Sequence, residues 1–404
     1  MQIQTSPGAR CTLSGWPGSA FFYADAKGRV GFTVAATDSA APVKTQMIDC
    51  VTAGLTQSIP LTLTHISGRA APQTPPIATT TPVSFIDIAS ANARFGIDIT
   101  SATEQQLLAH DLPPRPSDPD AYQRWLRAVV RPFTEVVHVG VDEPEVSHAL
   151  PQGLVRSGST GGITVGYVSK NWDGFAAPDP QYTWKLVQGQ WFVPTLNLSV
   201  DSTNGDTAAE WVGIDGFTSG SYPSYDLIQD GTNSIVTYSG GYAVASYYMW
   251  YEYIPQSLHL AFYLQPNDFV DCEAWAATPT SSTTAGEYWC EDANTGQVMS
   301  TSLANQGTAF KGTSAEWIVE RVTVNGSLTG LADFNNAYGY TQMQEPEATY
   351  TSTGQTVAAS TLSLGQITMN GTSGDALATA AFKQNRCTYS PCYPTFAYTW
   401  EARY

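Results

Sequence analysis

SAEWIVERVTV, residues 314–324, alternates in the manner of a β-strand, but Glu320 interrupts its apolar run. Successive side chains of a strand point to opposite faces of the sheet. Glu316 and Glu320 therefore share one face of this strand, and Trp317 lies on the other. The alternation predicts a sheet whose two faces differ in chemistry, with a carboxylate among the apolar residues of one of them.

The surrounding sequence has the same texture. From about Ile163 onward, short runs rich in Tyr, Trp, Val and Thr are broken by Gly, Asn, Asp and Ser, with almost no helical periodicity. This pattern is typical of a β-sandwich or barrel. We therefore expect residues 163–404 to form one all-β domain, and we find no repeat period typical of a propeller or solenoid.

Three further strands each have a polar or aromatic face. Parity groups Trp211 with Asp215, Leu227 with Gln229, and Trp250 with Glu252. A solvent-facing sheet normally carries Thr, Ser and Lys, and these faces carry scarcely any lysine. The pattern favours a binding surface for a chain-like ligand. The alternative is that each Trp is ordinary core and each acid ordinary surface.

The charge is unevenly distributed. The chain has 18 basic and 35 acidic residues, a net charge of −17, and residues 166–404 hold 22 of the acidic residues but only 7 basic ones. Such a domain repels phosphate backbones and anionic lipids, so we expect neither nucleic acid nor membrane partners. The excess of carboxylates suits an acidic medium, although solubility alone would also explain it.

Six cysteines are grouped locally in the sequence. The grouping predicts the disulfides Cys11–Cys50, Cys272–Cys290 and Cys387–Cys392, and buried free thiols are the alternative. A zinc site is not expected, because no His lies near a cysteine and no paired CxxC motif occurs. Disulfides imply an oxidising compartment, so we expect a secreted protein whose signal peptide is absent from this sequence, since MQIQTSPGAR lacks one.

The composition divides the chain into four parts. Residues 1–70 read as a small N-terminal β-module, residues 71–82 as a Pro- and Thr-rich linker, and residues 163–404 as the sandwich. Residues 83–162 differ: 102–112 and 117–133 have helical spacing, and SGSTGG at 157–162 reads as a flexible connector.

Most hydrolytic mechanisms lack their required residues here. Residues 166–404 contain only His259, which argues against Ser-His and Cys-His catalysis. No DTG or DSG sequence supplies an aspartic dyad, and no HExxH supplies a catalytic zinc. Glu320 could act as a general base on a water, and a neutral amide such as Gln229 could stabilise the oxyanion. This chemistry requires no metal and no cofactor.

Six motifs, in order, resemble the glutamic peptidases, or eqolisins, over about Lys170 to Phe334. They are NWDGF, VQGQWFVP, WVGIDG, LIQDGT, MWYEYIP and AEWIVE, which begin at residues 171, 187, 211, 227, 249 and 315. The resemblance implies a bent, concanavalin-like sandwich of two antiparallel seven-stranded sheets and acid-acting endopeptidase activity on polypeptides. It implies a catalytic pair of Gln229 and Glu320. Its substrate-binding positions fall on Trp211, Asp215, Trp250 and Glu252.

The chain departs from the family pattern in two places. Phe217, Thr218 and Ser219 follow WVGIDG where fungal members have a cysteine, so that disulfide is absent. Tyr247 and Tyr248 precede Trp250 where some members have an acid. This puts subsite preference in doubt.

Residues 94–131 resemble the pro-region of bacterial glutamic peptidases, which implies a self-processing zymogen inhibited by its own pro-region. Arg124, Arg127 and Arg131 lie on related turns of one predicted helix. We hypothesise that they bind the acidic domain at neutral pH and are released by acid. The alternative is a solvated helix face. We expect a monomer.

Two other functions are compatible with the same residues. A β-sandwich glycoside hydrolase needs two carboxylates at a defined separation, and Asp215, Glu252 and Glu320 could supply them. A non-catalytic, lectin-like module would need only the aromatic faces. Activity on casein and on polysaccharides at acid pH separates these readings.

Overall fold

The computed structural model describes most of the chain from residue 88 onward. Between residues 2 and 63 it describes strand backbones only. The other described residues are 88–131, 135–137, 146–159, 165–179, 184–198, 205–217, 225–239, 242–276, 285–305, 310–324, 326–335, 340–383 and 395–404. The predicted linker at 71–82 lies outside them.

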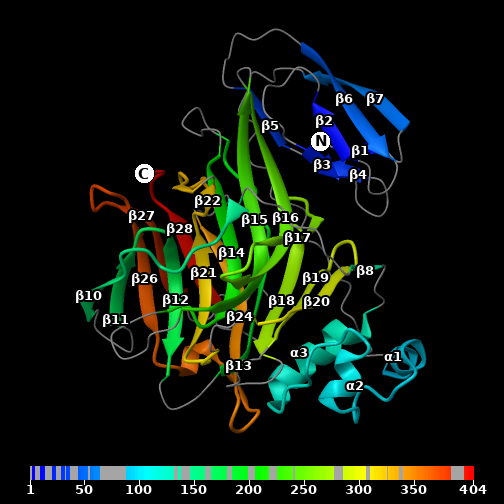
Figure 1. Ribbon diagram of the computed structural model, residues 1–404, viewed down its shortest axis with the longest axis vertical. Helices are drawn as coiled ribbons and strands as arrows, with labels where there is room; N and C mark the ends of the chain where they lie inside the picture. The colour runs from blue at the N-terminus through cyan, green and yellow to red at the C-terminus, as the bar shows by residue number, and fades with distance from the viewer. Residues whose placement is uncertain are drawn as a thin grey trace.

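The first layer of the β-domain is a series of hydrogen-bonded strands (Figure 1). In spatial order these are β10 (Val155–Ser159), β11 (Val165–Ser169), β26 (Gly365–Asn370), β12 (Trp172–Pro178), β21 (Ser314–Glu320), β14 (Thr207–Ile214), β15 (Leu227–Ser239), β16 (Tyr242–Ile254) and β17 (His259–Tyr263). All these pairs are antiparallel except β11 with β26.

The second layer begins at the same strand, β26. Its strands then follow as β27 (Ala376–Lys383), β28 (Thr395–Trp400), β24 (Thr341–Tyr350), β13 (Trp184–Phe192), β18 (Phe269–Ala276), β19 (Gly286–Asp292) and β20 (Gln297–Leu303). A short strand, β25 (Thr356–Ala358), pairs with β24 and precedes a 3₁₀ turn at Ala359–Thr361. Because β26 bonds to both series, the layers form one folded sheet. The all-β prediction is confirmed, and the division into two sheets of seven strands stays a prediction.

The main core lies between the two layers. Val212 and Trp317 of the first layer pack in one cluster with Trp191 and Phe396 of the second. A second cluster covers the other face of the first layer and includes Trp172, Trp211, Leu227, Trp250 and Ile318. We call this face the site face. Trp211, Leu227, Trp250 and Ile318 lie in this cluster, whereas Trp317 and Val319 lie in the main core, as alternation along the strands predicts.

The helical region packs against the outer side of the second layer. It contains α1 (Ile88–Phe95), α2 (Glu104–Leu108) and α3 (Pro119–Val130), at the lower right of Figure 1. Thr103 caps α2 through a capping box with Gln106, which explains where that helix begins. Ala128 and Leu108 pack on Trp275 and Trp289 of the sheet. Among the described helices, none is long and apolar enough to cross a membrane.

Three short strands follow the helices in the sequence and pair with strands of the β-domain. β8 (Glu135–Val137) pairs with β20, and β9 (Val146–Ser147) pairs with β22 (Thr323–Val324), whose other neighbour is β23 (Ser327–Leu328). The third strand, β10, pairs with β11. The first residues of the predicted flexible connector, Ser157 to Ser159, thus belong to a strand. The expected domain boundary at residue 162 lies outside the described residues.

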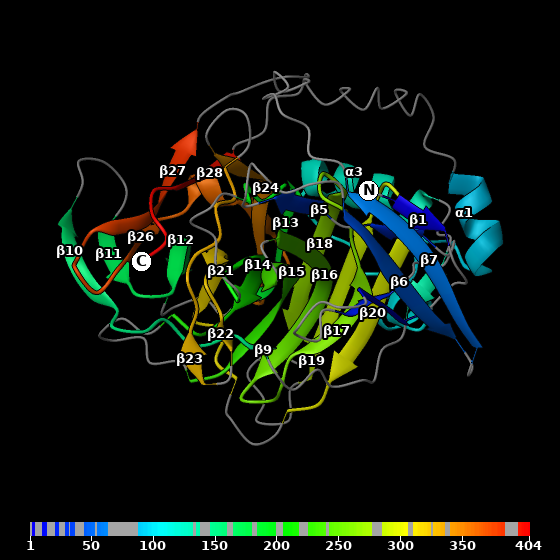
Figure 2. The ribbon, with the colours of Figure 1, turned by 90° about the horizontal axis from the view of Figure 1, so that it is seen from above.

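Short strands also lie in the region predicted to be the N-terminal module. They are β1 (Gln2–Gln4), β2 (Arg10–Leu13), β3 (Phe21–Tyr23), β4 (Arg29–Gly31), β5 (Thr33–Ala36), β6 (Lys44–Thr52) and β7 (Leu55–Leu63). β5 pairs with β16 and so links the module to the first layer, as Figure 2 shows from above.

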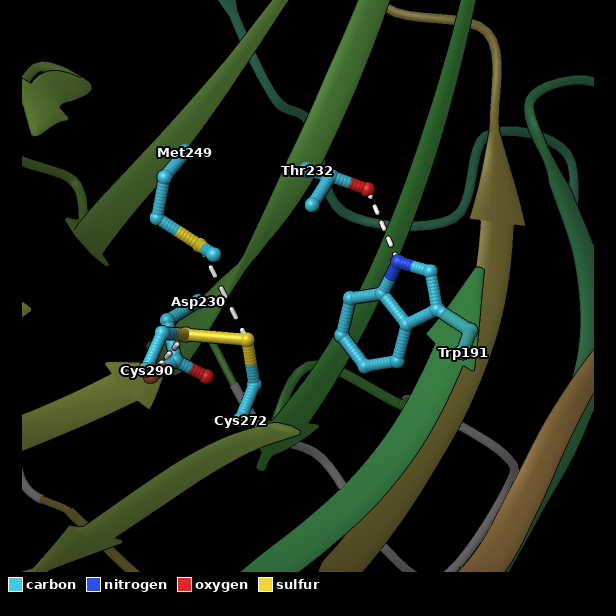
Figure 3. Close-up of a disulfide and its surroundings, with 6 residues drawn as sticks. All are labelled: Trp191, Asp230, Thr232, Met249, Cys272 and Cys290. Carbon is cyan, nitrogen blue, oxygen red and sulfur yellow. Dashed lines mark hydrogen bonds between the residues drawn. A yellow bond between two sulfur atoms is a disulfide. The ribbon is translucent and has the colours of Figure 1, made fainter. Parts of the chain in front are cut away.

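Cys272 and Cys290 form a disulfide between the neighbouring strands β18 and β19, which confirms that predicted pair (Figure 3). The carboxyl of Asp230 lies 3.4 Å from the sulfur of Cys290, and burial raises the pKa of Asp230 well above its usual range. The backbones of Cys11 and Cys50 face each other in β2 and β6. Cys387 and Cys392 lie outside the described residues.

Candidate active site

Strand β14 brings Gln229 and Glu320 onto one face. Gly213 of β14 is opposite Gln229 of β15, and Ala209 of β14 is opposite Glu320 of β21. Positions 209 and 213 have the same parity, so both side chains point to the site face. Gly213 adds no side chain there, and a Cβ at this position would lie 2.8 Å from the side chain of Leu227.

Glu320 is surrounded by hydrogen-bond donors. Its Oε2 accepts from Trp211 Nε1 at 3.0 Å and from His148 Nδ1 at 2.9 Å. Its Oε1 accepts from Asn171 Nδ2 at 3.1 Å and from the backbone N–H of Ala149 at 3.2 Å. An ionised carboxylate offers about four lone-pair sites. The four donors therefore occupy the whole acceptor capacity of Glu320.

Gln229 is held by a second carboxyl group. Its Nε2 donates to Glu252 Oε2 at 2.7 Å, while its Oε1 is buried without a hydrogen-bond partner among the described residues. Burial first, and the nearby charge of Glu320 second, raise the pKa of Glu252 well above its usual range. Burial thus favours the neutral form of Glu252, whose carboxyl holds Gln229 through this hydrogen bond.

His148 lies between these groups. Its ring stacks on Trp250 with centroids 3.8 Å apart and planes 18° from parallel, and its backbone N–H donates to the carboxyl of Glu252. The imidazole Nε2 is buried without a hydrogen-bond partner in the described structure. His148 thus touches three of the residues predicted from sequence, namely Glu320, Trp250 and Glu252.

The chain around His148 runs across the site face, and we call residues 146–154 the crossing segment. The carbonyl of Ala149 accepts from Trp172 Nε1 at 2.9 Å and from Asn171 Nδ2 at 3.1 Å. Leu150 and Leu154 pack against the site-face cluster. With this segment in place, Gln229 is 0% exposed and Glu320 is 1% exposed.

Asp215 does not join the other predicted residues. It follows the last residue of β14 with φ 73°, a left-handed conformation that Asp tolerates. Its carboxylate accepts from the backbone N–H groups of Lys311, Gly312 and Thr313 at 2.7 to 2.9 Å. These bonds hold the loop that leads into β21, so the structure gives Asp215 a loop-binding position. The turn rotates it away from the parity of the strand.

Tyr247 and Tyr248, where the chain departs from the family pattern, point to opposite faces of the sheet. Tyr247 belongs to the main core, where its hydroxyl accepts from the backbone N–H of Leu196. Tyr248 lies on the site face and its hydroxyl accepts from Asn233 at 2.6 Å. Where some family members have an acid, this chain thus has the hydroxyl of Tyr248 on the face that carries Trp250. That hydroxyl is already hydrogen-bonded to the amide of Asn233.

Four further residues of the site carry no role predicted from the sequence: His148, Ala149, Asn171 and Trp172. Asn171 and Trp172 open the motif NWDGF, so the motif marked both as candidates for the site. A single amide before a strand does not, however, reveal which groups it contacts. His148 lies 172 positions from Glu320 and outside the expected catalytic domain. No local pattern connects residues so distant in the chain.

Of the three arginines expected to bind the β-domain, Arg131 does so. Its Nη1 lies 3.3 Å from Glu291 Oε2, and Glu291 is buried. Burial raises the pKa of Glu291 to about 7, and the charge of Arg131 partly opposes this rise. A further ion pair joins Lys185 to Glu104 of α2. The side chain of Arg124 lies outside the described residues.

The sequence profile described as the Peptidase A4 family matches residues 170–389, and no curated protein matches the chain. Similar solved structures include scytalido-glutamic peptidase with a peptide-based transition-state analogue, with 20% identity, 57% of this chain and 98% of that chain covered, and a TM-score of 0.44.

Two more solved structures are similar. SCP-B, a member of the eqolisin family in a complex with the tripeptide Ala-Ile-His, has 19% identity, coverage of 57% and 98%, and a TM-score of 0.43. Aspergilloglutamic peptidase from Aspergillus niger has 26% identity, coverage of 48% and 99%, and a TM-score of 0.37. TM-scores below 0.5 are too low to establish a common fold, so the family assignment rests on the sequence match.

That match spans more than half of the chain and includes every motif from NWDGF to AEWIVE. The family hydrolyses peptide bonds, which sets aside the glycoside hydrolase and lectin readings. The protein therefore belongs to the Peptidase A4 family, the glutamic peptidases or eqolisins, and is a glutamic endopeptidase.

Proposed function

We propose that Glu320 and Gln229 are the catalytic pair of this peptidase. Both side chains are buried on one face of the sheet, and each is oriented by a hydrogen-bond partner, Trp211 for Glu320 and Glu252 for Gln229. Trp250 and Glu252 would contact substrate, because they hold the ring and the backbone N–H of His148.

The reaction is a hydrolysis by one activated water. Ionised Glu320 takes a proton from the water, whose oxygen bonds to the scissile carbonyl carbon. Gln229 donates a hydrogen bond to the oxyanion that develops. When the C–N bond breaks, Glu320 returns the proton to the leaving nitrogen. The products are a carboxyl group and an amine, and no redox or metal step is involved.

One observation carries this proposal. The backbone N–H of Ala149 lies 3.2 Å from Glu320 Oε1, so a carboxylate of the site already contacts a peptide nitrogen. A general acid must reach the nitrogen that leaves, within about 2.6–3.2 Å. A polypeptide lying along the crossing segment would meet this requirement at the same atom.

We further propose that the protein is made as a zymogen inhibited by its own helical region. The crossing segment occupies two acceptor positions of Glu320, through His148 and Ala149, and a catalytic water needs one of them. Ion pairs of Arg131 and Lys185 also attach the region to the β-domain. We expect acid-triggered self-processing, secretion as a monomer, disulfides at Cys11–Cys50 and Cys387–Cys392, and the family's two seven-stranded sheets.

The experiment is incubation of the full-length chain at pH about 4, near the reference pKa of glutamate. Mass spectrometry and a peptide-cleavage assay are run on the same samples. The proposal expects loss of the N-terminal region together with cleavage of added peptides. An intact chain that cleaves no peptide would contradict it, and an intact chain that cleaves peptides would contradict only the zymogen part.

A further inference from the structure

Asn171 makes contacts with both the proposed base and the crossing segment. Its Nδ2 lies 3.1 Å from Glu320 Oε1 and 3.1 Å from the carbonyl oxygen of Ala149, with the carbonyl of Leu150 further away at 3.4 Å. The side chain is fully buried. One amide nitrogen thus connects the reacting carboxylate to a peptide backbone.

The orientation of the Asn171 amide follows from its partners. Its Oδ1 accepts from the backbone N–H of Gln152 at 2.7 Å, and a backbone N–H can only donate. The carbonyl of Ala149 can only accept, so Nδ2 must face it. Ser169 Oγ donates to the same Oδ1 at 3.1 Å and completes the support. Exchange of the two amide atoms would place like groups together on both sides.

The position of Ala149 defines how a substrate would lie. Its nitrogen is the segment's backbone atom bonded to Glu320, which is the place of a leaving nitrogen in the proposed reaction. The carbonyl of the same residue is held by Asn171 Nδ2 and Trp172 Nε1. His148, the preceding residue, has its ring on Trp250 and its N–H on Glu252.

We propose that Asn171 is a positioning residue of the reaction, assisted by Trp172. One Nδ2 hydrogen orients Glu320, and the other binds the carbonyl of the substrate residue that supplies the leaving nitrogen. This inference rests on the proposed roles of Glu320 and Gln229. It predicts that recognition depends on a backbone carbonyl just beyond the scissile bond, so a substrate that ends at the leaving amine is bound poorly.

The first test uses the full-length chain and needs no catalysis. Asn171→Ala removes the acceptor for the Gln152 N–H and one donor to the Ala149 carbonyl. Amide hydrogen exchange in residues 148–152 should become roughly tenfold faster, as expected for the loss of a hydrogen bond. Asn335→Ala is the matched control, since Asn335 also bonds a backbone N–H and carbonyl, those of Trp400. Exchange that is unchanged in Asn171→Ala overturns the inference.

The second test uses the acid-treated protein and two peptides. One peptide is ordinary, and the other has an (E)-alkene in place of the peptide bond that follows the residue supplying the leaving nitrogen. For the wild type, kcat/KM on the alkene peptide should be roughly tenfold lower than on the ordinary peptide. For Asn171→Ala, kcat/KM should be nearly the same on both peptides, because this variant already lacks the contact. Equal losses in both enzymes overturn the inference.

Asn171→Asp adds a readout that a structural role would not affect. A carboxylate at position 171 disfavours the ionised form of Glu320, so the acidic limb of the kcat/KM profile should move to higher pH. Asn335→Asp should leave the limb in place. An unshifted limb in Asn171→Asp contradicts the inference. A wild type without peptidase activity contradicts the proposed function instead, and hydrogen exchange still decides whether Asn171 holds the backbone.

Discussion

His148 and Glu320, which lie 172 positions apart in the sequence, form a buried hydrogen bond of 2.9 Å between Nδ1 and Oε2. The same imidazole stacks on Trp250. His148 therefore occupies a position beside Glu320 that a water would need in the proposed mechanism. We propose that this contact keeps the full-length chain inactive.

His148→Ala should activate the full-length chain. Hydrogen bonds to charged groups contribute about 1.5–3 kcal/mol, so their loss should raise the open fraction of the site by roughly 10- to 100-fold. Peptide cleavage on first transfer to acid should start without the lag of the wild type. His259→Ala is the control, because His259 also stacks on a tyrosine ring, that of Tyr251, but outside the site. An unchanged lag in His148→Ala would count against occlusion.

Gln229→Ala should lower kcat by about 10²–10³-fold, the usual effect of removing one oxyanion donor. KM should change less, because the oxyanion exists only in the transition state. Gln190→Ala is a matched control: Gln190 likewise donates to a carboxyl at 2.7 Å, that of Asp271 in β18. Comparable kcat values for the two variants would remove Gln229 from the mechanism.

Strand alternation groups Leu227 with Gln229 and Trp250 with Glu252, because parity within one strand follows from backbone geometry alone. That these strands present one common face follows from their pairing register, which alternation does not give. Alternation fails for a residue just beyond a strand end. The left-handed turn at position 215 directs that carboxylate to a loop. Strand alternation also carries no information on contacts between distant segments of the chain.

The helices α2 and α3 could be predicted from their periodicity and caps, whereas α1 and the path of the crossing segment could not. That path depends on tertiary contacts: apolar side chains of the segment pack on the site-face cluster, and its backbone bonds to Asn171 and Glu320. The crossing segment, VSHALPQGL, has no helical or strand periodicity that would reveal such contacts. The sequence therefore predicted the pair proposed to be catalytic but not the segment that covers it.

The folded protein should be more stable in acid than at neutral pH. Burial raises the pKa of Glu210 to about 8 and that of Glu287 to about 7. The folded state then binds more protons than the unfolded state between pH about 4.5 and about 8, so the free energy of unfolding falls as pH rises through this window. Urea unfolding at several pH values measures the fall.

Glu210→Gln is the variant that checks this cause. It keeps the shape of the neutral side chain and removes one raised titration, so the decline of stability between pH about 4.5 and about 8 should become shallower. Glu401→Gln, at an exposed position, serves as the control. A stability that rises with pH in the wild type would contradict the assignment of buried neutral acids.

Removal of the Cys272–Cys290 disulfide should destabilise the β-domain without abolishing catalysis. The bond closes a loop of 18 positions, and a loop of this length corresponds to about 3 kcal/mol. The double variant Cys272→Ala, Cys290→Ala should show this loss in urea unfolding at constant pH. A loss below about 0.5 kcal/mol would indicate that the two strands are held by packing alone.

The most direct measurement compares kcat/KM of Glu320→Gln and Glu316→Gln on one peptide at acid pH. Both residues are buried acids on the same face of β21, and burial raises the pKa of Glu316 well above its usual range, so Gln mimics its neutral form. We predict a loss of at least about 100-fold for Glu320→Gln, the usual contribution of a general base, and near wild-type activity for Glu316→Gln. Activity of Glu320→Gln close to that of the wild type would contradict the account.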